Sequence, residues 1–170
     1  MEKDEYTRMS GMEEHFWWYR TLHELVDSTI LQWINRRSGS WYSRMPDGEH
    51  ASESAHSTSG NREYLPLQNV KSASGLRIFD AGCGTGRMME ILQKYGEVCG
   101  LDYSEDAVNY AVKRGLDKVL TGDLNNYQPI NEHYDIVVCL DVLYHSGIND
   151  DMAVTGKLYD TLKRDGIIII

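Results

Sequence analysis

The chain has 170 residues and a formal net charge of −9, from 17 lysines and arginines against 26 aspartates and glutamates. This length predicts one domain with a real hydrophobic core, and the acidic balance argues against a nucleic-acid binder that relies on a general basic surface. No apolar stretch reaches the length of a membrane span, and the four charged residues after Met1 are not those of a signal peptide. Cys83, Cys99 and Cys139 match no metal-ligand spacing, so we expect buried, reduced thiols in a cytoplasmic protein.

The N-terminal part, residues 1–37, is predicted to be a polar tail followed by an amphipathic helix that acts as a cap or lid. Residues 1–13 are polar and acidic and are expected to fray. From Glu14 to about Arg37 apolar residues recur at steps of three and four, which favours a helix. The segment His15–Arg20 is unusually aromatic. Its rings either pin the helix to a sheet or form a lid over a pocket.

Residues 38–74 break this pattern with many serines mixed with glycine and acidic residues and without a sustained apolar period. A structureless loop of this length is rare inside a compact domain. We therefore predict a flexible insertion between the aromatic helix and the rest of the chain.

Residues 75–170 alternate regularly between predicted strands and helices. The apolar runs and their caps indicate strands at Leu76–Asp80, Val98–Asp102, Lys118–Thr121, Tyr134–Leu140 and Ile167–Ile170, with helices at about Arg87–Tyr95, Ser104–Arg114 and Asp150–Lys163. Gly96 and Gly115 are expected to end the first two of these helices. This order predicts an α/β, Rossmann-like, doubly wound fold with a mostly parallel sheet and helices on both faces.

The most informative stretch follows the first of these strands. The apolar run ends at Asp80, and Gly82, Gly84 and Gly86 follow at every second position before the next helix. Glycines accept positive φ and leave the backbone open, so the turn can point N–H groups at a ligand beside the positive end of that helix. A dinucleotide fingerprint would need its last glycine at position 87, where Arg87 stands, so the spacing leans away from NAD.

Two further acids follow the next two strands. The carboxyl ends of parallel strands meet at one edge of a sheet, which would bring Asp102 and Asp123 close to Asp80. The carboxylate of Asp102 can accept two hydrogen bonds from a ribose diol. Asp123 can accept from an exocyclic amine while the backbone N–H of Leu124 donates to a ring nitrogen. Together these residues predict a nucleoside site.

These residues resemble the motifs of class I S-adenosylmethionine-dependent methyltransferases, in particular the small-molecule type 11/23-like subgroup. The matching segments are Ile78–Gly86, Val98–Ser104, Gly122–Leu124, Tyr134–Val138, Leu162–Ile167 and the aromatic His15–Arg20. The resemblance implies S-adenosylmethionine as cofactor and S-adenosylhomocysteine as product. It also implies a small-molecule acceptor. The composition and residue spacing predict no metal site and no membrane association, and the acidic charge argues against a nucleic-acid partner.

The resemblance also implies a role for each site residue. The turn under the methionine end of the cofactor would be shaped by Asp80, Gly82, Cys83, Gly84 and Gly86. The adenosine would be held by Asp102, Tyr103, Asp123 and Leu124, with Leu140 near the sulfonium. The acceptor would be faced by Trp17, Tyr19, Asp141 and Tyr144. His145, the one histidine expected at the strand ends, would be the general base for a hydroxyl acceptor, since the ordinary pKa of imidazole suits this task.

Two features depart from the family pattern. The chain has Lys163-Arg164-Asp165-Gly166 where the family usually has Lys-Pro-Gly-Gly. The family fold has seven strands, and this chain stops in what should be the fifth, so we expect a fragment or an incomplete domain that lacks the last strands. An exposed edge at Ile167–Ile170 would favour self-association.

The favoured function is therefore O- or N-methylation of a small molecule. A module that binds the cofactor but is catalytically incomplete is the alternative, and an NAD-dependent oxidoreductase is a more distant one.

Overall fold

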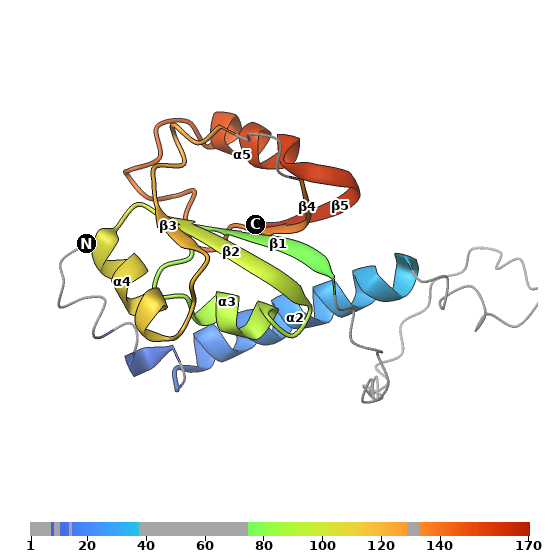
Figure 1. Cartoon of the computed structure of the whole chain (residues 1–170), viewed down its shortest axis with the longest axis horizontal. Helices are drawn as coiled ribbons and strands as arrows, with labels where there is room; N and C mark the ends of the chain where they lie inside the picture. The colour runs from blue at the N-terminus through green and yellow to red at the C-terminus, as the bar shows by residue number, and fades with distance from the viewer. Residues whose placement is uncertain (1–7, 9–10, 14, 38–74, 129–132) are drawn as a thin grey trace, which may run out of the picture.

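Five parallel strands form one sheet in the computed structural model, which describes residues 8, 11–13, 15–37, 75–128 and 133–170 (Figure 1). The strands are β1 (Leu76–Ala81), β2 (Gly96–Asp102), β3 (Val119–Thr121), β4 (Tyr134–Val138) and β5 (Leu162–Ile169). Their order is β3-β2-β1-β4-β5, so the chain builds outward from β1 in one direction and then in the other. The predicted doubly wound α/β fold is confirmed. The predicted insertion at 38–74 lies outside the described residues.

Helices cover both faces of this sheet (Figure 1). They are α2 (Trp17–Arg37), α3 (Arg87–Leu92), α4 (Glu105–Lys113) and α5 (Asp151–Asp160). Successive residues of a strand point to opposite faces. Ile78 and Ile136 accordingly pack in one hydrophobic cluster with residues of α2, α3 and α4, while Phe79 and Val137 pack in a second cluster with residues of α5.

The register of the strands brings their carboxyl ends to one edge. Asp80 in β1 lies opposite Gly100 in β2, and Asp102 at the end of β2 lies opposite Thr121 at the end of β3. β1 also pairs with β4 through Asp80 and Val138. The segments that follow these strands therefore start from neighbouring points, as the sequence predicted.

One predicted boundary is wrong because of a contact with a distant strand. Gly96 was expected to stop a helix ending near Tyr95, but α3 ends at Leu92 and Gly96 is the first residue of β2. A Cβ at this position would clash with the carbonyl oxygen of Leu76, its partner in β1. Glycine is present here because two backbones approach closely.

The boundary between α5 and β5 is also shifted. The predicted helix to Lys163 ends at Asp160, where Thr161 caps it through its Oγ1 and the carbonyl oxygen of Leu158. The strand then begins at Leu162, which pairs with Tyr134, instead of at Ile167. An irregularity follows in this ladder, with Asp165 at a positive φ of 66°, before regular pairing resumes. The polar residues of this irregular stretch hid the start of the strand in the sequence.

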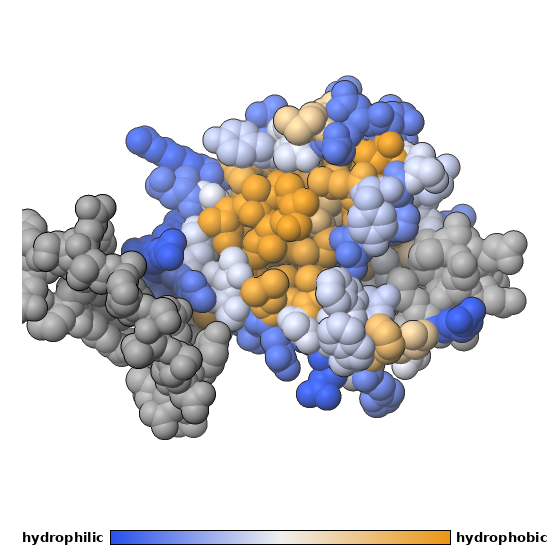
Figure 2. Space-filling model, turned by 180° about the vertical axis from the view of Figure 1, so that it is seen from behind, coloured by the Kyte–Doolittle hydropathy of each residue, from blue (hydrophilic) through white to orange (hydrophobic). Residues whose placement is uncertain are grey.

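β5 is an edge of the sheet, paired with β4 on one side. Its isoleucines are half-buried, and Ile170 after it is 58% exposed. Figure 2 shows hydrophobic side chains gathered in the middle of the face of the molecule that Figure 1 hides.

The helix α2 is anchored by a narrow part of its apolar stripe. Val26 and Ile30 are fully buried against the sheet cluster, whereas Trp18 and Leu25, which belong to the same predicted stripe, are largely exposed. The Trp33 ring N–H also donates to the carbonyl oxygen of Asp165, 3.2 Å away. The N-terminal helix is thus packed on the sheet as part of the core.

We expect Ile30→Ala to destabilise the protein by about 2–4 kcal/mol, because it removes buried methylenes and leaves a cavity under α2. Leu25→Ala on the same helix is the matched control and should cost less than about 1 kcal/mol, since Leu25 is 61% exposed. Urea unfolding followed by circular dichroism measures both. Equal costs for the two variants would contradict the packing of α2 against the sheet.

Candidate functional site

A cavity of about 760 Å³ opens at the carboxyl ends of the strands. Its walls come from α2 and the residue Glu13 before it, the glycine turn after β1, the ends of β2 and β3, and the loop after β4. Thirteen of the predicted site residues line it: Tyr19, Asp80, Gly82, Cys83, Gly84, Asp102, Tyr103, Asp123, Leu124, Leu140, Asp141, Tyr144 and His145. The fold therefore gathers residues that are more than a hundred positions apart in the sequence.

Two predicted residues, Gly86 and Trp17, are not among the lining residues. Gly86 has a φ of 85°, and a Cβ there would clash with Leu116 and crowd Ala111. Its place is therefore explained by the packing of α3 and α4. Trp17 is 66% exposed at the start of α2.

The glycine turn is fastened to β2. The N–H groups of Gly82 and Cys83 both donate to the carbonyl oxygen of Leu101, at 2.7 and 3.1 Å. Gly82 has a φ of 86°, and a Cβ there would clash with Val142 in the loop after β4. Glycine at this position therefore serves both the left-handed backbone and the close approach of a second loop.

Asp102 joins this turn to the start of α4. Its Oδ2 accepts from the N–H of Gly84 at 2.8 Å, and its Oδ1 accepts from the N–H of Ser104 at 2.9 Å. Each carboxylate oxygen can accept more than one hydrogen bond, so Asp102 keeps acceptor capacity while it lines the cavity.

Asp80 is the least satisfied group of the site. The residue is 3% exposed, and among the described residues its Oδ2 has no hydrogen-bond partner. Burial, together with the nearby charge of Asp102, raises the pKa of Asp80 to about 7. A buried carboxylate without a partner is costly, so this position favours a ligand that brings a cationic donor.

Asp123 belongs to a polar junction between two loops. Its Oδ1 accepts from the backbone N–H and the side-chain amide of Asn125, both at 2.8 Å, and its Oδ2 accepts from Asn126 at 2.8 Å. The amide of Asn125 also donates to the carbonyl oxygen of Gly147 at 2.7 Å. This junction holds the loop after β3 against the loop after β4.

The far side of the cavity is aromatic. The rings of Tyr144 and His145 lie 4.8 Å apart, and both residues are exposed at the mouth. Tyr19 faces them from α2. Burial and the charges of Glu13, Asp141 and Tyr144 raise the pKa of Tyr19. Residues of α2 and of the loop after β4 thus line the same cavity.

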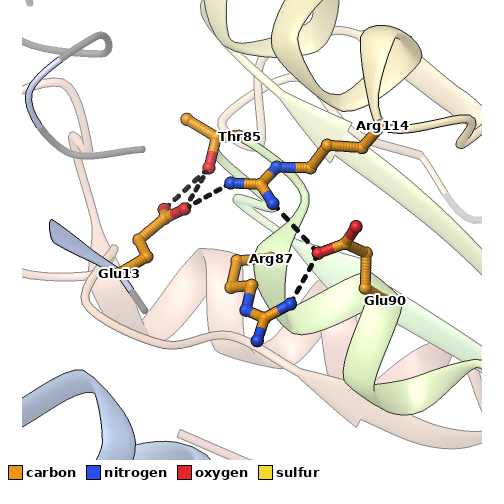
Figure 3. Close-up of polar contacts among 5 residues, drawn as sticks. All are labelled: Glu13, Thr85, Arg87, Glu90 and Arg114. Carbon is orange, nitrogen blue, oxygen red and sulfur yellow. Dashed lines mark hydrogen bonds and ion pairs between the residues drawn. The ribbon is translucent and has the colours of Figure 1, made fainter. Parts of the chain in front are cut away.

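The lining residues that the sequence missed include three with ionisable side chains: Glu13, His23 and Arg87. Residues 1–13 were expected to fray, yet Glu13 is only 6% exposed, and the hydroxyl of Thr85 lies 2.7 Å from both of its carboxylate oxygens (Figure 3). Burial raises the pKa of Glu13, while the contacts with Thr85 and Arg114 oppose this rise. The expectation of a single histidine at the site is also wrong, because His23 of α2 lines the cavity as well as His145.

A parallel sheet with a glycine turn and acids at its strand ends defines a Rossmann-like nucleoside-binding class. Residues 79–170 match the family Methyltransf_11, described as Methyltransferase domain. The chain belongs to this family of class I S-adenosylmethionine-dependent methyltransferases, and the resemblance seen in the sequence is confirmed.

The chain is also similar to individual proteins. The chain is 31% identical over 130 residues to a ubiquinone biosynthesis O-methyltransferase of Hydrogenovibrio crunogenus, covering 72% of this chain and 52% of that protein. A solved complex of the Haloferax volcanii Trm112 methyltransferase activator and a putative methyltransferase matches at 24% identity with a TM-score of 0.50, covering 56% and 44%. A methyltransferase of Thiobacillus denitrificans, solved with S-adenosyl-L-homocysteine, matches at 24% with a TM-score of 0.48, covering 56% and 41%.

The chain spans about half to two-thirds of the length of the curated relatives that it matches, 52% of one and 63% of another. Among the described residues, no helix is long and apolar enough to cross a membrane.

We expect Asp80→Asn to stabilise the ligand-free protein at pH 8. Because the pKa of Asp80 is raised from 3.8 to about 7, the folded state binds this proton more tightly than the unfolded chain does. The stability of the folded protein therefore falls as the pH rises from about 4 to about 7. Above pH 7 the buried, ionised carboxyl costs the folded state at most about 4 kcal/mol of stability. The gain from the substitution should therefore be largest at pH 8 and shrink towards pH 5.

Free energies of unfolding at the two pH values, measured for both proteins in urea, check this expectation. Asp160→Asn, an exposed site at the end of α5, is the control and should change the stability little at either pH. A gain that is the same at pH 5 and pH 8 would contradict a raised pKa at Asp80.

Proposed function

We propose that this chain binds S-adenosylmethionine in the cavity and transfers its methyl group to an oxygen or nitrogen of a small-molecule acceptor. The observation that carries this proposal is the buried Oδ2 of Asp80, which has no hydrogen-bond partner in the described part of the chain and lies beside an open glycine turn. The amino-acid end of the cofactor offers an ammonium group for that oxygen and fits under backbone that has no side chains. Family membership supports the same reaction.

The other cofactor residues follow from their places in the wall. Gly82, Cys83 and Gly84 shape the turn under the methionine end, and Gly86 sets the helix that follows. Asp102 uses its remaining acceptor capacity for the ribose hydroxyls, and Tyr103, at the rim, borders the adenine. Asp123 and the N–H of Leu124 read the adenine edge. Leu140 lies near the sulfonium.

When bound, the cofactor supplies a methyl group on a sulfonium that is already a good leaving group. The protein's task is then to hold the acceptor atom in line with that methyl group. Tyr19 from α2 and Asp141 and Tyr144 from the loop after β4 face this space. Trp17 lies outside the cavity wall, and its proposed contact with the acceptor requires a ligand that extends beyond the mouth.

His145 takes the proton from a hydroxyl acceptor in this proposal. His23 is a second candidate, supported by its place in the wall and by burial and the charge of Arg87, which lower its pKa and keep the imidazole neutral at neutral pH. A neutral imidazole is the form that accepts a proton.

The remaining proposals concern the surroundings of the protein. The acidic composition argues against nucleic acid as a partner, and the three cysteines, expected to be reduced thiols, suit a cytoplasmic location. The unpaired side of β5 with the exposed Ile170 favours self-association. We also place a cap function in residues 1–37, supported by Glu13, Tyr19 and His23 in the cavity wall.

A module that binds the cofactor without catalysis is the second candidate. Both candidates bind S-adenosylhomocysteine, but only the enzyme releases it from S-adenosylmethionine when an acceptor is present.

Calorimetry with S-adenosylhomocysteine tests the cofactor site. We expect Asp102→Ala to weaken binding roughly 10- to 100-fold, because the carboxylate both fixes the glycine turn and accepts from the ribose. Asp160→Asn should bind as the wild type does. Unchanged affinity in Asp102→Ala would refute the proposed place of the ribose.

Turnover separates the two histidines. We expect His145→Ala to reduce the formation of S-adenosylhomocysteine roughly 100-fold across a panel of hydroxyl acceptors, while binding of that product stays within about twofold. His23→Ala is the matched variant, since His23 of α2 also lines the cavity. A turnover loss confined to His23→Ala would transfer the role of base to His23, and an equal loss of binding and turnover in His145→Ala would show that His145 is structural.

A further inference from the structure

The charges on the cavity wall are strongly one-sided. Among the described residues that line it, five are carboxylates, namely Glu13, Asp80, Asp102, Asp123 and Asp141, and one is a lysine or arginine, Arg87. Such a wall suits a ligand with cationic and hydroxyl groups. A ligand that also carries an anionic group meets a fixed positive charge at one place on this wall.

Arg87 stands directly after the glycine turn, as the first residue of α3. Its side chain is 31% exposed and lines the cavity. One nitrogen, Nη1, donates to Glu90 Oε2 at 2.9 Å. Its Nε is buried and, among the described residues, has no acceptor. A guanidinium offers five N–H donors in a fixed plane, so Arg87 holds more donor capacity than its contact with Glu90 uses.

Glu90 does not depend on Arg87 for its charge balance. Arg114, at the end of α4, donates from Nη1 to the same Oε2 of Glu90 at 3.0 Å and from Nη2 to Glu13 at 3.0 Å (Figure 3). Arg114 is 17% exposed, so this pairing is well shielded from water. The Arg114 contact therefore fixes the position of the Glu90 carboxylate. That carboxylate in turn accepts a hydrogen bond from the Arg87 guanidinium, which lines the cavity.

We propose that Arg87 binds a carboxylate of the ligand in this cavity and that the Arg114–Glu90 pair positions it for this contact. The inference rests on the proposed function and adds a protein partner, Arg87, for a carboxylate group of the ligand. Asp80 and Arg87 stand at the two ends of one glycine turn, so the first suits an ammonium group and the second a carboxylate. The α-carboxylate of the cofactor offers this chemistry, and a carboxylate on the acceptor is the other source.

Two pairs of probes distinguish the sources. S-adenosylhomocysteine has an amino-acid end that 5′-methylthioadenosine lacks, and 4-hydroxybenzoate has a carboxylate that phenol lacks. Calorimetry with the first pair uses the free protein, and calorimetry with the second uses the protein saturated with S-adenosylhomocysteine. The variants are Arg87→Met and Arg87→Lys. Lys118→Met, an exposed cation before β3 that pairs with Glu97, is the matched control for the lost charge.

We expect Arg87→Met to weaken the binding of S-adenosylhomocysteine roughly 10- to 100-fold and to change the affinity for 5′-methylthioadenosine by no more than about twofold. Arg87→Lys should recover part of the loss, because the charge returns without the planar donor fork. Lys118→Met should bind both as the wild type does. If Arg87→Met binds S-adenosylhomocysteine unchanged but selectively loses binding of 4-hydroxybenzoate, the carboxylate site is also supported. In that case it belongs to the acceptor.

Two results would overturn the inference while the adenosyl site stands. One is an equal loss of S-adenosylhomocysteine and 5′-methylthioadenosine in Arg87→Met, which would make Arg87 structural. The other is unchanged binding of S-adenosylhomocysteine and 4-hydroxybenzoate. Failure of the wild type to bind either adenosyl compound would refute the proposed function and this inference with it. The urea midpoint of each variant, measured alongside, shows that the compared proteins are folded.

Discussion

The close contact between the glycine turn and β2 is the constraint on which the rest of the site depends. The carbonyl of Leu101 accepts two backbone N–H groups of the turn, and the carboxylate of Asp102 accepts a third, from Gly84. Because the turn is held in this way, the helix α3 begins beside the cavity, with Thr85 and Arg87 on either side of Gly86. The loop after β4 then closes against the bare backbone of Gly82.

Electrostatics then decides what this cavity can hold. The acids at the strand ends and Glu13 make the wall predominantly negative, and none of the residues that the structure describes donates a hydrogen bond to the buried Oδ2 of Asp80. A folded protein tolerates a buried polar atom without a hydrogen-bond partner where a ligand supplies that partner. Burial raises the pKa of Asp80 to about 7, which favours the protonated carboxyl in the ligand-free protein below that pH, and a cationic ligand would replace that proton.

Local patterns in the sequence predicted most of the fold and half of the residues that line the cavity. Apolar runs that end in acids, and glycines at every second position, are set by residues a few positions apart, and these signals identified Asp80, Asp102 and Asp123 correctly as neighbours. The predictions that were wrong concern residues whose contacts lie far away in the sequence. Glu13 is buried because Arg114, 101 positions away, donates to it, and Gly96 belongs to a strand because the backbone of Leu76 lies against it. Neither contact leaves a periodic signal in the chain.

The pH dependence of S-adenosylhomocysteine binding to the wild-type protein tests the central claim most directly. If the ionised carboxylate of Asp80 receives the ammonium group of the ligand, affinity should rise about tenfold from pH 6 to pH 8 and level off above, since the pKa of Asp80 is about 7. Calorimetry in buffers of different ionisation enthalpy should then show proton release at pH 6. An affinity that is constant across this range, with no proton released, would contradict the claim that Asp80 is completed by a cationic ligand.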